Sequence, residues 1–97
     1  MKKIVVTRHP ALVEYLLEIG MIRQGEFALI AHATPENLVN QDVFGVLPLS
    51  LAYFCHYVTE IPLELTPEDR GKELSIERLR EIAGAPQKYS VRKIGNL

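Results

Sequence analysis

Three hydrogen-bonding side chains stand together near the start of the chain, between an apolar run and a proline. Thr7, Arg8 and His9 follow the run 4–6 and precede Pro10. A continuous β-branched run is typical of a short strand that is buried on both faces. A proline is favoured in the first turn of a helix, where its missing N–H costs nothing. The three side chains therefore occupy a strand-to-helix turn, the position at which open α/β sheets bind ligands and helix N-termini attract anions.

Each of these side chains has a chemical and a structural interpretation. Arg8 can donate two hydrogen bonds to a phosphate, or it can be a solvated loop arginine. His9 is suited to proton transfer near neutral pH, but it can also be a weak helix cap. The Thr7 hydroxyl can bond its own turn or donate to a phosphate. Residue types alone leave these alternatives open.

Two further turns carry candidate residues. Leu47 ends the apolar run 43–47, and Pro48 and Ser50 follow it in a second strand–proline–helix arrangement. The Ser50 hydroxyl can cap free N–H groups or meet an anion at that helix end. His32 follows the run 26–31, where a structural histidine is the favoured interpretation.

Periodicity and turn residues divide the chain into alternating strands and helices. Beyond the first strand we expect a helix at 11–20, strands at 26–31 and 43–47, a capped turn at 34–37, a helix at 49–58, a marginal edge strand at 60–65, a helix at 75–83 and a short strand at 89–94. This order predicts an α/β fold, a small, doubly wound, mostly parallel Rossmann-like sheet flanked by helices. If the strand order is 2-1-3-4, the turns after the first and third strands lie side by side at the topological switch point.

The segment 49–58 is apolar on nearly every side if it is helical. Such a helix needs cover on two sides, and a chain of 97 residues offers one core. We therefore expect a homodimer. The polar segment 66–72 contains Arg70, Gly71 and Lys72, which form either a solvated loop or a lid over a ligand.

Composition restricts the function classes. The length indicates one domain over 1–97, and a net charge of −1 argues against a surface that coats duplex nucleic acid. The single Cys55 cannot form an internal disulfide, which fits a cytoplasmic setting. The apolar runs are too short for a membrane span. The chain has neither a Gly-rich phosphate loop nor a zinc-spaced Cys/His pair, so we expect no metal and no cofactor.

Three segments, 6–11, 45–52 and 68–75, together resemble a family of very small stand-alone proteins associated with type III CRISPR systems. The family is similar to the CRISPR-associated Rossmann-fold (CARF) sensors, which are homodimers that bind cyclic oligoadenylate across their two-fold axis. The resemblance implies a ring nuclease, an enzyme that opens cyclic oligoadenylate, with the cyclic tetramer as the expected substrate. Opening the ring would switch off the antiviral signal.

These observations lead to one main hypothesis and two alternatives. The main hypothesis is a metal-independent ring nuclease, in which a 2′-hydroxyl of the ligand attacks the neighbouring phosphate and leaves a 2′,3′-cyclic phosphate. The expected catalytic residues are Arg8, His9 and Arg70, and the expected ligand-binding residues are Thr7, Pro10, His32, Leu47, Pro48, Ser50, Gly71 and Lys72. The alternatives are a module that binds a cyclic oligonucleotide without cutting it and a structural partner of a larger complex.

Overall fold

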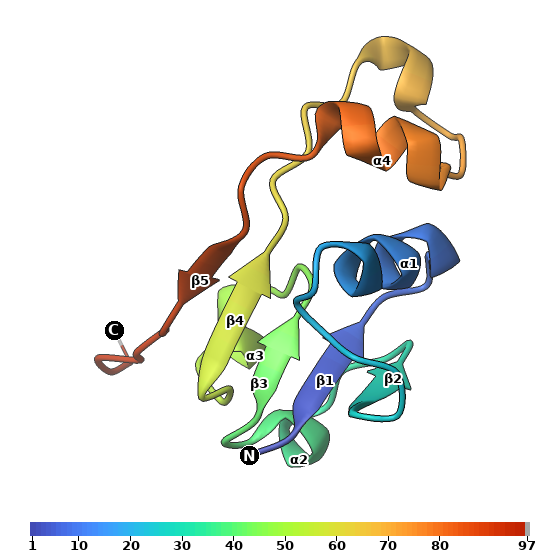
Figure 1. Ribbon diagram of the computed structural model, residues 1–97. Coiled ribbons are helices and arrows are strands. Elements are labelled where there is room, and N and C mark those ends of the chain that lie inside the picture. Colours follow the sequence, from blue (N-terminus) through green and yellow to red (C-terminus); the bar gives the residue numbers. More distant parts are fainter. Residues whose placement is uncertain (97) are drawn as a thin grey trace.

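The computed structural model describes residues 1–96 and contains a five-stranded sheet in the order β2-β1-β3-β4-β5 (Figure 1). The strands are β1 (Lys3–Val6), β2 (Phe27–Ile30), β3 (Asp42–Phe44), β4 (Tyr57–Glu60) and β5 (Gln87–Tyr89). The first four are parallel, and β5 is antiparallel at one edge. The predicted mostly parallel α/β sheet is confirmed, and the first four strands have the order 2-1-3-4, the condition under which the turns after the first and third strands lie side by side.

The register brings the ends of the parallel strands to one edge of the sheet, here called the carboxyl edge. Val6 of β1 pairs with Ile30 of β2, and Val5 pairs with Phe44 of β3. Since the chain adds β2 on one side of β1 and β3 on the other, the turns that follow β1 and β3 are neighbours at the switch point.

Helices cover both faces of the sheet. The helices are α1 (Pro10–Glu18), α2 (Pro35–Leu38), α3 (Leu49–Ala52) and α4 (Ile76–Ile82). On the α1 side, a buried cluster joins Val5, Leu16, Ile22, Phe44 and Ile61. On the α2 and α3 side, a second cluster joins Ile4, Leu38, Val43, Ala52, Cys55 and Val58. Because neighbouring residues of β1 and β3 alternate between the two clusters, the inner strands are buried on both faces.

The predicted helix over 49–58 is wrong. The helix ends at Ala52, and the backbone N–H of His56 donates to the carbonyl of Gln41 (2.8 Å) as the chain turns into β4 at Tyr57. Its apolar residues are shared among a short helix, a turn and a strand buried on both faces. A buried strand and a buried helix both appear as continuous apolar runs, so periodicity could not separate them. The expectation of a homodimer therefore loses its original basis.

The predicted strand over 60–65 is also wrong, because β4 ends at Glu60 and the chain leaves the sheet. Pro62 lacks an N–H, and its carbonyl accepts from Gly84 (2.8 Å). Leu63 forms an isolated bridge with Ala83. These contacts join the segment that leaves β4 to the segment that leads into β5, and α4 lies between the two, beyond the end of the sheet (Figure 1). Residues 61–86 are here called the hairpin.

The hairpin contacts the rest of the protein through α4, which packs on α1. Nε of Arg80 donates to a Glu18 carboxylate oxygen at 2.8 Å. The helix predicted at 75–83 is confirmed as α4, and Ser75 caps it, since its hydroxyl accepts from the N–H of Arg78 (3.1 Å). The C-terminal strand lies at 87–89 rather than at 89–94.

The capped turn predicted at 34–37 is confirmed as a capping box between Thr34 and Asn37. Within residues 1–96, the helices are too short and too polar to span a bilayer.

Candidate functional site

The turn after β1 is held by its own hydrogen bonds. The N–H of Thr7 donates to the carbonyl of Ile30 (3.1 Å), and the Thr7 hydroxyl accepts from the N–H of His9 (3.1 Å). His9 occupies the N-cap of α1 with an extended backbone, and its side chain makes no capping bond. Pro10 follows at the first helical position. The predicted turn is therefore confirmed, and the exposed His9 imidazole is not used in capping.

Arg8 and His32 meet at the ends of β1 and β2. Nη2 of Arg8 lies 3.1 Å from Nε2 and 3.2 Å from Nδ1 of His32. No carboxylate within residues 1–96 lies within 4.0 Å of Arg8. His32 thus positions the guanidinium, and no carboxylate neutralises its charge, so Arg8 is available to bind an anion.

A pocket of about 390 Å³, here called the Arg8 pocket, opens between this turn and the hairpin. Its polar wall consists of Thr7, Arg8 and His9. The rest of its lining is apolar: Val6, Ala11, Leu12, Ala31, Val46, Leu63, Leu74 and Leu79. The arrangement places a cation, an imidazole and a hydroxyl at the wall of an apolar pocket, where polar interactions with a ligand are strengthened.

The same turn also borders a second hollow, of about 400 Å³, beside α1. Pro10 lines this hollow together with Glu14, Gln24 and Leu29, and the wall again includes Thr7, Arg8 and His9. The three polar residues therefore lie on a ridge between the two hollows. Of these two hollows, Pro10 lines only the one beside α1, whereas Val46 and the hairpin leucines line only the Arg8 pocket.

The turn after β3 depends on Gly45. Its φ is +146°, and a Cβ atom there would lie 2.5 Å from the carbonyl oxygen of Val6. Only glycine tolerates so close an approach of the β1 backbone. Immediately after it, Val46 is 76% exposed and lines the Arg8 pocket.

The binding residues predicted after β3 do not line the same pocket as those predicted after β1. Leu47 lines a different pocket, described below, that shares Val46 with the Arg8 pocket. Pro48 is the N-cap of α3, and Ser50 is exposed in a helix of four residues with no side-chain cap bond. The two turns are neighbours and share the Arg8 pocket through Val46, but Leu47 faces the other pocket, and Pro48 and Ser50 line neither of the two.

Arg70, Gly71 and Lys72 lie in the hairpin loop and are not part of the lining of the Arg8 pocket, which Leu74 reaches. A clasp at the base of the loop holds this segment: Arg78 donates to both carboxylate oxygens of Asp69, each at 2.9 Å. These hydrogen bonds hold the pKa of the Asp69 carboxyl well below its usual range.

Sequence reasoning missed Val46 and the hairpin leucines Leu63, Leu74 and Leu79. Val46 was placed inside the predicted strand 43–47, and its exposure became visible only because β3 ends at Phe44. The leucines had no detectable signal, because the hairpin brings them to the pocket only through contacts distant in sequence.

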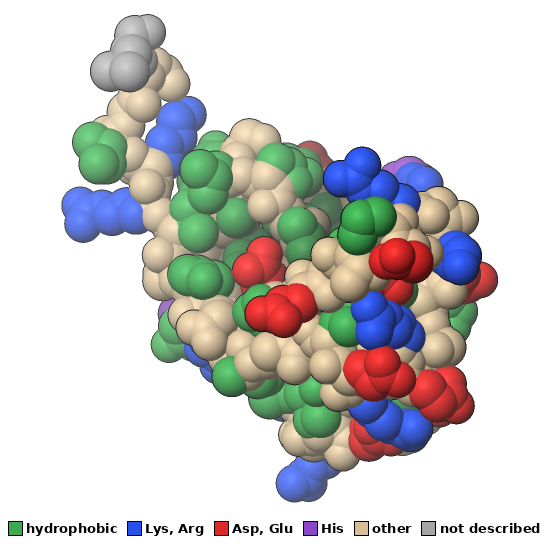
Figure 2. Space-filling model, turned by 90° about the horizontal axis from the view of Figure 1, so that it is seen from above, with side chains coloured by type: hydrophobic (Ala, Val, Ile, Leu, Met, Phe, Trp, Pro, Cys, Tyr) green, Lys and Arg blue, Asp and Glu red, His purple; other side chains and the backbone are tan. Residues whose placement is uncertain are grey.

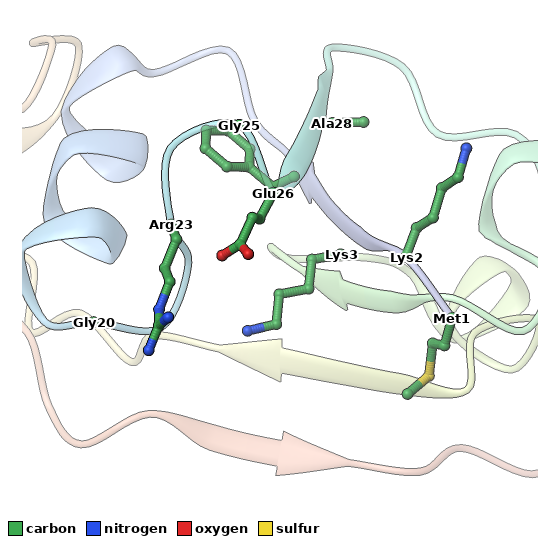
Figure 3. Close-up of a pocket in the computed structure, with 9 residues that line it drawn as sticks. Met1, Lys2, Lys3, Gly20, Arg23, Gly25, Glu26 and Ala28 are labelled. Atoms are coloured by element: carbon green, nitrogen blue, oxygen red, sulfur yellow. The ribbon is translucent and has the colours of Figure 1, made fainter.

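Another cavity, of about 750 Å³, lies at the opposite edge of the sheet. Lys3, Arg23 and Glu26 extend toward it (Figure 3). Nζ of Lys3 donates a hydrogen bond to the backbone carbonyl of Met21 (3.1 Å), so this ammonium group already has a structural partner. No cluster of three or more His, Cys, Asp or Glu that could hold a metal occurs within the described residues.

A family model matches residues 4–92, and its description is "Putative CRISPR-associated protein (Cas_VVA1548)". Neither the curated proteins nor the solved structures contain a match. The family model spans all five strands, the turn that carries Arg8 and His9, and the hairpin. The chain therefore belongs to this family of CRISPR-associated proteins.

Proposed function

We propose that the protein is a ring nuclease that binds cyclic oligoadenylate, with the cyclic tetramer as its substrate, and opens it without a metal ion. One observation carries the proposal. The Arg8 guanidinium, which contacts His32 and has no carboxylate neighbour within residues 1–96, lies beside the exposed His9 imidazole at the wall of the Arg8 pocket. A CRISPR-associated family and the resemblance to CARF sensors point to cyclic oligoadenylate as the ligand.

The proposed reaction needs no added reactant. The 2′-oxygen of one ribose attacks the adjacent phosphorus, the bond from phosphorus to the 5′-oxygen breaks, and a 2′,3′-cyclic phosphate and a 5′-hydroxyl result. The proton lost from the 2′-oxygen goes to solvent, and protonated His9 donates one to the leaving 5′-oxygen. Arg8 stabilises the charge that develops on the phosphoryl oxygens. His32 holds the Arg8 guanidinium, and the Thr7 hydroxyl is adjacent to the same wall.

The proposal retains a homodimer on a new basis. Val46 and Leu49, on either side of the turn after β3, are 76% and 74% exposed. Viewed onto the carboxyl edge, hydrophobic side chains gather beside the C-terminal segment (Figure 2). A two-fold symmetric ring placed between two such edges would take half of its contacts from each subunit. Light scattering at tens of micromolar protein with ligand present tests this, and a monomer under those conditions refutes it.

The central experiment incubates the purified protein with cyclic tetra-adenylate and separates the products by chromatography. We expect linear products with 2′,3′-cyclic phosphate ends, at a rate that excess EDTA leaves nearly unchanged. Binding without cleavage would identify the alternative, a module that captures the ring. Absence of binding would refute the proposed function, and loss of activity in EDTA that manganese restores would refute the metal-independent mechanism.

The catalytic role expected for Arg70 stays a prediction, because the residue lies outside the pocket lining. Arg70→Ala tests it directly. If this variant cleaves the ring at the rate of the unmodified protein, Arg70 has no part in the reaction.

A further inference from the structure

Another pocket, distinct from the hollow beside α1, adjoins the Arg8 pocket. It contains a carboxylate that the proposed reaction does not use. This pocket, here called the Tyr89 groove, has a volume of about 310 Å³. Its lining is Gly45, Val46, Leu47, Leu49, Ala52, Val58, Glu60, Tyr89 and Val91. Glu60 is the one charged residue among them, and Val46 is common to both pockets.

The sheet register explains why these residues converge. Val58 of β4 pairs with Tyr89 of β5, and Glu60 lies two residues beyond Val58 on the same face. Leu49 and Ala52 of α3 form the other wall. The result is a groove with an aromatic ring and aliphatic side chains on its walls and a single acceptor group at β4.

The Glu60 carboxylate makes no ion pair within residues 1–96. It is half-buried, and apart from the Tyr89 hydroxyl the surrounding side chains of the groove supply no donor. A carboxylate that has lost part of its hydration is stabilised when a ligand supplies a hydrogen-bond donor. A ligand in the groove therefore gains the most binding free energy if it donates an N–H group to the Glu60 carboxylate.

We propose that the Tyr89 groove binds one adenine base of the ligand and that Glu60 accepts a hydrogen bond from the adenine 6-amino group. This inference rests on the proposed function, which supplies the adenine ring. The flat base packs between Tyr89 and the aliphatic wall. Because Val46 separates the groove from the Arg8 pocket, a base in the groove leaves its sugar and phosphate next to Arg8. Glu60 is then a specificity-determining residue rather than a catalytic one.

The test compares two rings in equilibrium binding: cyclic tetra-adenylate, and the same ring with purine, which lacks the 6-amino group, in place of adenine. His9→Ala serves as the parent protein, so that cleavage does not interfere. A hydrogen bond to a charged group predicts that the parent binds the adenine ring about 10-fold or more tightly than the purine ring. In the Glu60→Ala variant of this parent we expect equal affinities for the two rings.

Two variants and one control sharpen the result. Glu60→Gln should keep the preference, because its amide oxygen accepts from the same amino group. Tyr89→Ala should weaken binding of both rings without changing their ratio. Glu64→Ala, a matched change outside the groove, should leave both affinities unchanged.

The outcomes separate the two proposals. If the parent binds neither ring, the proposed function fails, and this inference fails with it. If the parent binds both rings equally, or if Glu60→Ala keeps the preference, the assignment of Glu60 is wrong while the proposed function stands. Circular dichroism of each variant excludes unfolding as the cause.

Discussion

Replacement of Gly45 by alanine tests whether the switch point depends on close backbone contact. The added Cβ would lie 2.5 Å from the carbonyl oxygen of Val6 and 3.4 Å from its Cβ. The nearest atom belongs to the backbone of β1, a central strand, so no flexible side chain can move aside. The N–H of Gly45 also donates to the carbonyl of Thr59 (3.0 Å), which ties the same residue to β4.

Two costs determine the expected effect. A side chain at a φ of +146° is strained by about 1–3 kcal/mol. Relief of the clash by a shift of β1 or β3 costs about another 1–3 kcal/mol, the usual cost of overpacking. The sum, about 2–6 kcal/mol, is a large part of the roughly 5–15 kcal/mol by which a domain is stable. At about 4–8 °C per kcal/mol for a domain of this size, Tm should fall by roughly 10 °C or more.

Thermal unfolding followed by circular dichroism measures the effect, and Gly25→Ala is the matched control. Gly25 also has a positive φ, +77°, but a Cβ there meets nothing within 4 Å. Gly25→Ala should therefore show backbone strain alone, of about 1–2 kcal/mol. A Gly45→Ala protein that melts at the temperature of Gly25→Ala would show that the β1–β3 approach adjusts freely, and the reasoning would be refuted.

Three further predictions follow from the site and the clasp. Arg8→Ala should weaken binding of cyclic tetra-adenylate by about 1.5–3 kcal/mol, measured by calorimetry, because a charge-assisted hydrogen bond is lost; unchanged affinity in a folded variant would move the phosphate site elsewhere. His9→Ala should lower kcat by roughly 10²- to 10⁴-fold and change KM little, as expected for proton transfer; a normal rate would remove His9 from the mechanism. The pKa of Asp69 is lowered in the folded protein, so the Asp69 carboxylate contributes fully to stability above its ordinary pKa of 3.8, and this contribution declines as the pH falls below 3.8. Between pH 5 and pH 3, Tm should therefore fall less in Asp69→Asn than in the unmodified protein. An equal fall of Tm in the two proteins would contradict this prediction.

Local signals were sufficient where a residue pattern has one structural outcome. Pro10 after a β-branched run defined the strand-to-helix turn, and Ser75 defined the start of α4. Local signals failed at 49–65, because the apolar residues of α3 and β4 show no periodicity that would distinguish a helix from a strand. The strand is set by the hydrogen bond from His56 to Gln41 and by pairing with β3, both contacts with distant residues.

The candidate site was foreseen only in part, for the same reason. The sequence indicated that Thr7, Arg8 and His9 share a turn, and it placed His32 on the same rim. It did not indicate that His32 contacts Arg8, since that contact depends on the parallel pairing of β1 and β2. The roles of Ser50 and Arg70 stay predictions, because neither residue lines the Arg8 pocket.

The sequence by itself therefore determined much of the alternation of strands and helices and the polar turn at the carboxyl edge. These features follow from short-range preferences of proline, of β-branched runs and of capping side chains. The tertiary structure decided which walls enclose that turn. Leu74 and Leu79 reach the Arg8 pocket only because the hairpin folds back onto α1, and Glu60 and Tyr89 line one groove only because β5 pairs antiparallel to β4. Such contacts join residues far apart in the chain, and their free energy comes from burial and pairing that no local pattern records.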